Sequence, residues 1–177
     1  VLQPATANLA PYKDDTPNQP LLPVLPKAGH IVSQRHESAL GIERIELSNG
    51  VTVLLKPTST GKDELLMTAF APGGSSRLEQ ADFANARFFN RIVGSSGLGD
   101  FSSQQLTKVL TGQTANVNLS LDTYWLSLNS SASTRDAECL LQQTYLYFTA
   151  LRPNQQAFDN IMANSRARLS QVAGLPE

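Results

Sequence analysis

The stretch that decides the fold occupies residues 73–112 and reads GGSSRLEQADFANARFFNRIVGSSGLGDFSSQQLTKVLTG. It opens with a glycine turn, after which apolar residues recur at helical spacing over residues 78–93. A second glycine-rich turn, residues 94–100, separates this expected helix from another over residues 101–110. Ser102 and Gln105 have the spacing of a capping box for the second helix. The pattern therefore predicts two consecutive helices joined by a flexible turn.

Strands are expected on the amino-terminal side of this stretch. Residues 42–47 alternate with period two, and a second β-branched run covers residues 51–56. Asn49 and Gly50 lie between them, and Asn-Gly is a strong hairpin signal because both residues tolerate positive φ. Residues 64–71 form a nearly continuous apolar run, so we expect a third strand that is buried on both faces.

A second hairpin and two further helices are expected on the carboxyl-terminal side. Residues 114–121 and 123–129 alternate, with Asp122 in the turn between them. Thr134 is expected to cap a long helix, and Asn154 a last one. The order β-β-β-α-α-β-β-α-α predicts an α+β fold, in which an antiparallel sheet has helices packed on one face.

Length and composition indicate one domain with a tail, and they argue against nucleic acid and the bilayer interior as partners. The chain has 177 residues, 41% of them apolar, only 16% charged, and a net charge of −1. The sequence has no basic stripe of the kind that usually binds nucleic acid. It also has no apolar run that approaches the roughly 20 residues needed to span a bilayer. Residues 1–29 contain six prolines, which predicts a Pro-rich linker or tail. Residues 30–177 are then expected to form the α+β domain.

Few residues of this chain have a type and spacing that could carry chemistry. The segment that begins at His36 starts like a zinc-binding His-Glu-x-x-His motif but lacks the second histidine, and His30 is the only other histidine. Residues 94–100 could cradle a phosphate, but they lack the Lys-Ser/Thr pair of a P-loop, and Asp100 would repel an anion. Cys139 is the single cysteine, which excludes an internal disulfide and favours a small buried residue. These residues predict no catalytic site.

Five pieces of the sequence carry a family resemblance. They are residues 47–53 (LSNGVTV), 73–76 (GGSS), 96–102 (SGLGDFS), 106–112 (LTKVLTG) and the expected helix over 139–148, which ends at Arg152. Their order, within about residues 42–170, resembles the insulinase/pitrilysin family of zinc metallopeptidases. The resemblance implies a repeat with the fold of mitochondrial processing peptidase.

The metal-binding motif of that family is altered in this chain. Catalytic domains carry His-x-x-Glu-His on the first helix after the glycine turn, where two histidines ligate zinc and the glutamate activates water. In the matching frame this sequence has Asn85, Phe88 and Phe89. It also has no glutamate between Glu138 and Glu177 to supply the distant ligand. The resemblance thus implies a non-catalytic repeat with no catalytic and no metal-ligating residue.

The resemblance also implies a place in a larger protein. Such a repeat is the third domain, at the start of the carboxyl-terminal half, with zinc held in an amino-terminal domain of the parent polypeptide. Residues 1–29 would be the linker between halves, and the domain would be truncated at its carboxyl-terminal end. Implied partners are peptide substrate, the amino-terminal catalytic half, and a second copy through an unpaired sheet edge. Because some members of the family are periplasmic, the resemblance favours the bacterial periplasm as the location of this chain.

Three functions stay open at this point. The first is a non-catalytic domain that forms part of the substrate-chamber wall and peptide-binding surface of a zinc metalloendopeptidase. The second is a structural or processing-complex subunit of the same fold without peptidase activity. The third is an independent hydrolase whose site is unrecognised.

Overall fold

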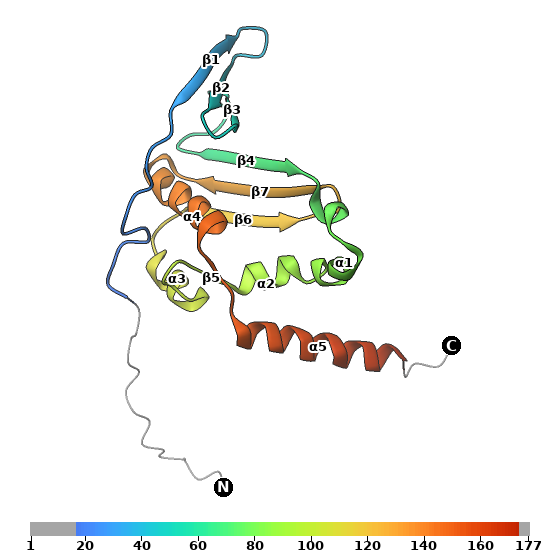
Figure 1. The fold of residues 1–177 in the computed structure, drawn as a ribbon. Helices are drawn as coiled ribbons and strands as arrows, with labels where there is room; N and C mark the ends of the chain where they lie inside the picture. Colours follow the sequence, from blue (N-terminus) through green and yellow to red (C-terminus); the bar gives the residue numbers. More distant parts are fainter. Residues whose placement is uncertain (1–16, 174–177) are drawn as a thin grey trace.

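The computed structural model describes residues 17–173, which fold into antiparallel sheets with helices packed against them (Figure 1). This confirms the α+β class. The first sheet has the order β1-β2-β3 and the second the order β4-β7-β6, while β5 and β8 form a short ribbon. The strands are β1 (Ile31–Glu37), β2 (Ile42–Leu47), β3 (Thr52–Leu55), β4 (Leu65–Pro72), β5 (Gly97–Leu98), β6 (Asn116–Leu121), β7 (Trp125–Ala132) and β8 (Leu151–Arg152).

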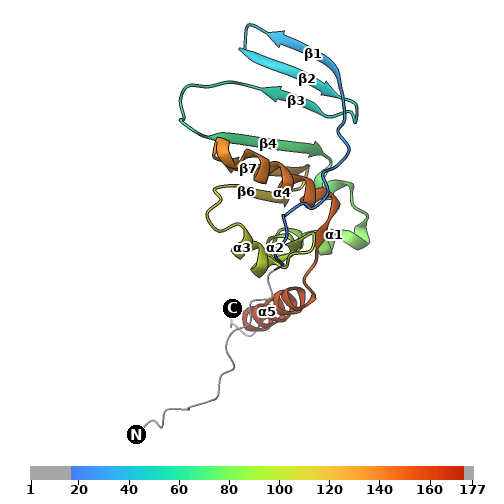
Figure 2. The same cartoon turned by 90° about the vertical axis from the view of Figure 1, so that its left-hand side faces the viewer.

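The helices cover one face of the second sheet, where α2 and α4 pack against β6 and β7 (Figures 1 and 2). Within residues 17–173, no helix is both long enough and apolar enough to cross a bilayer. The helices are η1 (Gly74–Arg77), α1 (Gln80–Ala86), α2 (Phe89–Ser95), α3 (Ser103–Val109), η2 (Thr134–Asp136), α4 (Ala137–Thr149) and α5 (Gln155–Ala173).

Both expected hairpins are present. In the β2–β3 turn Gly50 has a φ of 83°, and its N–H donates to the Leu47 carbonyl at 2.9 Å. Such a φ favours glycine, which explains the Asn-Gly signal. Strands β6 and β7 pair from Leu121 and Leu126 at the turn to Asn116 and Ser131. Strand β1 was not predicted from the sequence, because its polar and charged residues show no alternation of apolar and polar side chains.

Two clusters of buried side chains form the core. The first lies between the second sheet and helices α2 and α4, and the second joins α3, α4 and β5. Phe101, Leu128 and Leu140 are the largest fully buried side chains among the described residues. The first cluster contains Val93, Val117, Leu119, Leu128, Ala132 and Leu140, and the second contains Leu21, Leu98, Phe101, Leu106 and Leu146.

The Pro-rich segment contributes to the second cluster. Leu21 is 8% exposed and packs there, and Leu22 lies partly buried beside it. Val24 and Leu25, by contrast, are exposed. Residues 1–16 of the predicted linker lie outside the described part of the chain. The described remainder of the segment is therefore held against the domain by Leu21 and Leu22 and by Gln19, whose Nε2 donates to Asp100 Oδ2 at 2.9 Å.

Two expectations about burial and helix length are wrong. Strand β4 is not buried on both faces: it lies at the edge of its sheet, and Leu66 and Phe70 are each 70% exposed. The single helix expected over residues 78–93 is divided into α1 and α2. At the break the Phe88 N–H donates to the Asn85 carbonyl, three residues back, at 3.0 Å. This tighter bond interrupts the α-helical ladder.

The helix caps agree with the sequence at two of three positions. Ser102 and Gln105 form the expected capping box at α3, and the Ala157 N–H donates to the Asn154 side chain at 3.1 Å, at the start of α5. The cap assigned to Thr134 belongs instead to Ser133, whose Oγ accepts from the Asp136 N–H at 3.2 Å. The helix therefore starts with the short turn η2 before α4.

Candidate functional site

The three motif positions lie on α1, on α2 and at the junction between them. Asn85 is exposed near the end of α1, and Phe88 precedes α2. Phe89 is the first residue of α2 and packs, partly buried, against the core cluster under the second sheet. The phenyl ring at the last position thus serves packing, because it contributes to the contact between helix and sheet.

These side chains do not fit a zinc ion. Zinc takes thiolate, imidazole or carboxylate ligands, usually four in a tetrahedron, and the three positions supply one amide and two phenyl rings. Across residues 17–173, no three His, Cys, Asp or Glu residues come together in a way that could hold a metal. We therefore derive no zinc-dependent step for this chain.

The two histidines lie at the first sheet. His36 is on β1, and its Nδ1 is 2.6 Å from Oε1 of Glu43 on β2. The hydrogen bond from His36, supported by one from Gln34, lowers the pKa of Glu43 below its ordinary value. The His30 backbone N–H donates to Ser48 Oγ at 3.3 Å. The pair of His36 and Glu43 joins two strands of a hairpin, with His36 exposed and Glu43 half-buried.

Cys139 is half-buried on α4 beside the second core cluster. Burial raises the pKa of its thiol, and Gln143 Nε2 lies 3.5 Å from its sulfur. A raised pKa leaves less thiolate at neutral pH, and the thiolate is the reactive form. The environment thus favours a packing role for this residue.

The glycine-rich segment, residues 94–100, is buried at its centre and hydrogen-bonded to a distant part of the chain. Ser96, Gly97 and Leu98 are buried, and β5 pairs with β8 across about fifty residues of sequence. The Gly99 N–H donates to the Ala150 carbonyl at 2.8 Å, so it is not directed at an anion. The expectation of a flexible turn is wrong, because the pairing with β8 was not visible in the local sequence.

The surface most suited to contact with a partner is the uncovered face of the second sheet. Alternation in β4, β6 and β7 directs one set of side chains toward the core and the other set away from it. The outward set forms a shallow groove, lined mainly by amides and hydroxyls. Its outward-facing residues are Leu66, Thr68, Asn116, Asn118, Asn129 and Ser131. Ser130 also borders the groove, but it alternates onto the core side with Leu128, and its Oγ donates to the Met67 carbonyl at 3.0 Å. We call this surface the open face.

Two aromatic side chains lie at one end of the open face. Phe70 and Trp125 meet edge to face, with ring centroids 5.4 Å apart, and they are 70% and 46% exposed. The exposed polar alternation of Asn116 and Asn118 was the available signal that this face of the sheet is uncovered.

The two larger sheets have facing edges. Among the described residues, β3 pairs only with β2, and β4 pairs only with β7. Figures 1 and 2 show β3 and β4 running next to each other at the adjoining margins of the two sheets. Each therefore presents backbone donors and acceptors without a strand partner on one side.

Comparison with known proteins gives a distant relationship. No protein-family model matches the sequence. An Arabidopsis thaliana protein described as "Zinc protease PQQL-like" is 28% identical over 102 residues, which cover 58% of this chain and 11% of that protein. The chain is thus distantly homologous to a small part of this PqqL-like zinc protease.

Solved structures share the fold. The periplasmic protease PqqL from Escherichia coli superposes with a TM-score of 0.79 at 21% identity, over 95% of this chain and 18% of that chain. A mutant of the ferredoxin protease FusC, in complex with Arabidopsis ferredoxin, gives 0.76 at 21% identity, over 93% of this chain and 18% of that one. The chain therefore spans less than a fifth of the length of these proteins.

Proposed function

We propose that this distant relative of insulinase-like proteases is a non-catalytic domain of a zinc metalloendopeptidase. In this proposal it is the third domain, with residues 1–29 as the linker that precedes it, and zinc is held by an amino-terminal domain of the same polypeptide. The domain forms part of the substrate-chamber wall. It positions peptide and performs no bond cleavage.

The observation that supports this proposal most strongly is the position of Phe89. Where a catalytic repeat would place a ligand, α2 places a phenyl ring that packs against the sheet core. Asn85 is an exposed amide and Phe88 a second phenyl ring, so neither can ligate zinc firmly or activate water. The segment is used for packing, and the chemistry is assigned to another domain.

The open face supports a role in peptide contact. An extended peptide needs hydrogen-bonding groups for its backbone and apolar positions for its side chains. The groove supplies the amides of Asn116, Asn118 and Asn129, and Phe70 and Trp125 supply apolar surface. The unpaired edges of β3 and β4 offer additional backbone partners.

The chain contains a built-in probe for this contact, because Trp125 is its only tryptophan. Titration with an unstructured, uncharged peptide is expected to shift Trp125 emission in a saturable way. Phe70→Ala should weaken this binding about five-fold, since an aromatic contact is worth on the order of 1 kcal/mol. Phe83→Ala is the matched control, because Phe83 is exposed on α1. The peptide should remain uncleaved.

Two results would contradict the proposal separately. Unchanged Trp125 emission at saturating peptide would remove the peptide-contact role. Cleavage of the peptide by this chain alone would remove the assignment as a non-catalytic domain.

A further inference from the structure

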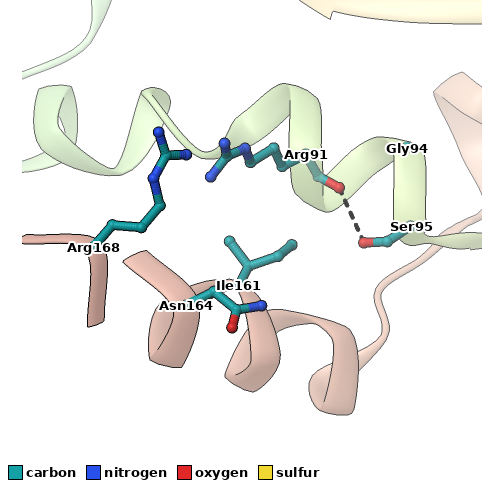
Figure 3. A pocket seen from close by; sticks show the side chains of 6 residues that line it. All are labelled: Arg91, Gly94, Ser95, Ile161, Asn164 and Arg168. Carbon is teal, nitrogen blue, oxygen red and sulfur yellow. Dashed lines mark hydrogen bonds between the residues drawn. The ribbon is translucent and has the colours of Figure 1, made fainter. Parts of the chain in front are cut away.

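A pocket between α2 and α5 contains two arginines from different helices (Figure 3). Arg91 comes from α2 and Arg168 from α5, and their guanidinium groups extend toward the same space. Ile161 lies below them, and Asn164 is beside it. Gly94 and Ser95 complete the lining, so no acidic residue takes part in it.

The positive charge of this pocket has no counter-charge from residues 17–173. No hydrogen bond or ion pair of the Arg91 or Arg168 guanidinium occurs within that part of the chain. Ser95 Oγ is already used, because it donates to the carbonyls of Arg91 and Ile92, each at 3.0 Å. The two positive charges repel each other across this space. An anion bound between them would be attracted to both, and this attraction would offset the repulsion.

We propose that this pocket binds a carboxylate of an acidic peptide segment. Each guanidinium can donate two parallel hydrogen bonds to a carboxylate, so two of them can hold both oxygens. Ile161 gives the pocket an apolar floor against which the methylenes of a glutamate side chain can pack. The Asn164 amide can donate to a peptide carbonyl.

The apolar floor distinguishes this ligand from a free inorganic anion. A phosphate ion has no methylene to place on Ile161 and would have to give up water without that contact. The pocket is also on the helical side of the molecule, because α2 packs on the covered face of the second sheet. The carboxylate site is therefore separate from the open face, and it does not depend on the proposed peptidase role.

Fluorescence anisotropy of a labelled glutamate-rich peptide tests the proposal. Binding is expected to weaken at least ten-fold in the double variant Arg91→Gln/Arg168→Gln, and to weaken as salt is raised. Arg87→Gln and Arg166→Gln are matched controls, because both arginines are exposed nearby and neither lines the pocket. Both control variants should bind like the wild type. In a separate titration with the uncharged peptide, Trp125 emission reports binding at the open face, and its change should be the same in all variants.

Three outcomes would overturn the assignment. The first is equal binding of the same peptide with glutamine in place of glutamate. The second is an equal loss of affinity in the Arg87 or Arg166 control. The third is displacement of the peptide by inorganic phosphate at equal concentration, which would reassign the pocket to a free anion. Circular dichroism of each variant shows whether a loss of binding reflects a loss of fold.

Discussion

Asn90 exchanges two hydrogen bonds with the backbone of Leu121. Its Nδ2 donates to the Leu121 carbonyl at 3.2 Å, and the Leu121 N–H donates to its Oδ1 at 2.8 Å. Leu121 ends β6, which is one of the two edge strands of the second sheet, so the amide side chain takes the place of a neighbouring strand. The residue directly before it is Phe89, which packs into the core. Consecutive residues at the start of α2 therefore fasten this helix to the sheet.

The Asn90 pair should be measurable as stability. We expect Asn90→Ala to lower the free energy of unfolding by about 1 kcal/mol, since it leaves the Leu121 groups without their partner. Urea unfolding monitored by circular dichroism measures the change. Asn118→Ala is the control, because Asn118 is exposed on the open face, and it should change stability little. Equal effects of the two substitutions would show that the Asn90 pair is not structural.

Two glycines in the glycine-rich segment should respond oppositely to alanine. A Cβ on Gly97 would lie 2.0 Å from the Phe101 carbonyl oxygen, so Gly97→Ala should destabilise by about 2 kcal/mol or more. A Cβ on Gly94 would meet nothing within 4 Å. Because Gly94 is inside α2, Gly94→Ala should stabilise by about 0.5–1 kcal/mol. Thermal unfolding of both variants is sufficient; a tolerated Gly97→Ala would mean that β5 is not packed as described.

The glycine-rich segment also shows where sequence reasoning failed. Its composition is typical of a flexible turn, but its structure depends on pairing with β8 about fifty residues later. Strand β4 is a similar case, since its apolar run indicated burial, while its edge position leaves Leu66 and Phe70 exposed. Both errors concern tertiary contacts, which local patterns do not contain.

Local features were predicted well. The Asn-Gly hairpin, the capping box of Ser102 and the Asn154 cap all depend on residues that lie close in sequence. The candidate sites divide in the same way. The motif positions came from the family resemblance, which needs only neighbouring residues, whereas the pocket of Arg91 and Arg168 joins two helices that are far apart in the chain. Only the structure brings those two arginines together.

Stability should fall at acid pH partly because of Asp136. Its carboxylate is 5% exposed and accepts hydrogen bonds from Arg135, from the Thr114 N–H and Oγ1, and from Ser133 Oγ. The Arg135 hydrogen bond, followed by those of Thr114, lowers the pKa of Asp136 far below its ordinary value. The stability from this group is therefore fully present above the unfolded pKa and is lost as pH falls from about 5 toward 2.

The comparison of Asp136→Asn with wild type tests this linkage. The variant should have a lower Tm at neutral pH, and the difference should shrink as pH is lowered, because the Asp136 carboxyl of the unfolded wild-type chain becomes protonated first and this favours unfolding. Asp82→Asn, an exposed change on α1, should follow the wild-type curve. A difference between Asp136→Asn and wild type that is constant from neutral to acid pH would contradict the assigned pKa shift.

The facing edges of β3 and β4 should promote self-association. Unpaired strand edges pair with other chains unless charge or cover prevents it. We expect concentration-dependent dimerisation in sedimentation velocity, and its suppression by Leu54→Lys on β3. Leu40→Lys is a matched control, because Leu40 and Leu54 are both 58% exposed and Leu40 lies in the β1–β2 turn. A monomer at all concentrations would remove this expectation.

The most direct test of the non-catalytic assignment is the zinc content of the purified chain. The protein is equilibrated with zinc and passed through gel filtration. The molar ratio of zinc to protein is then measured, with zinc quantified by elemental mass spectrometry. Asn85, Phe88 and Phe89 provide no imidazole or carboxylate at the motif positions, so we predict far less than one zinc per chain. One retained zinc per chain would contradict the account.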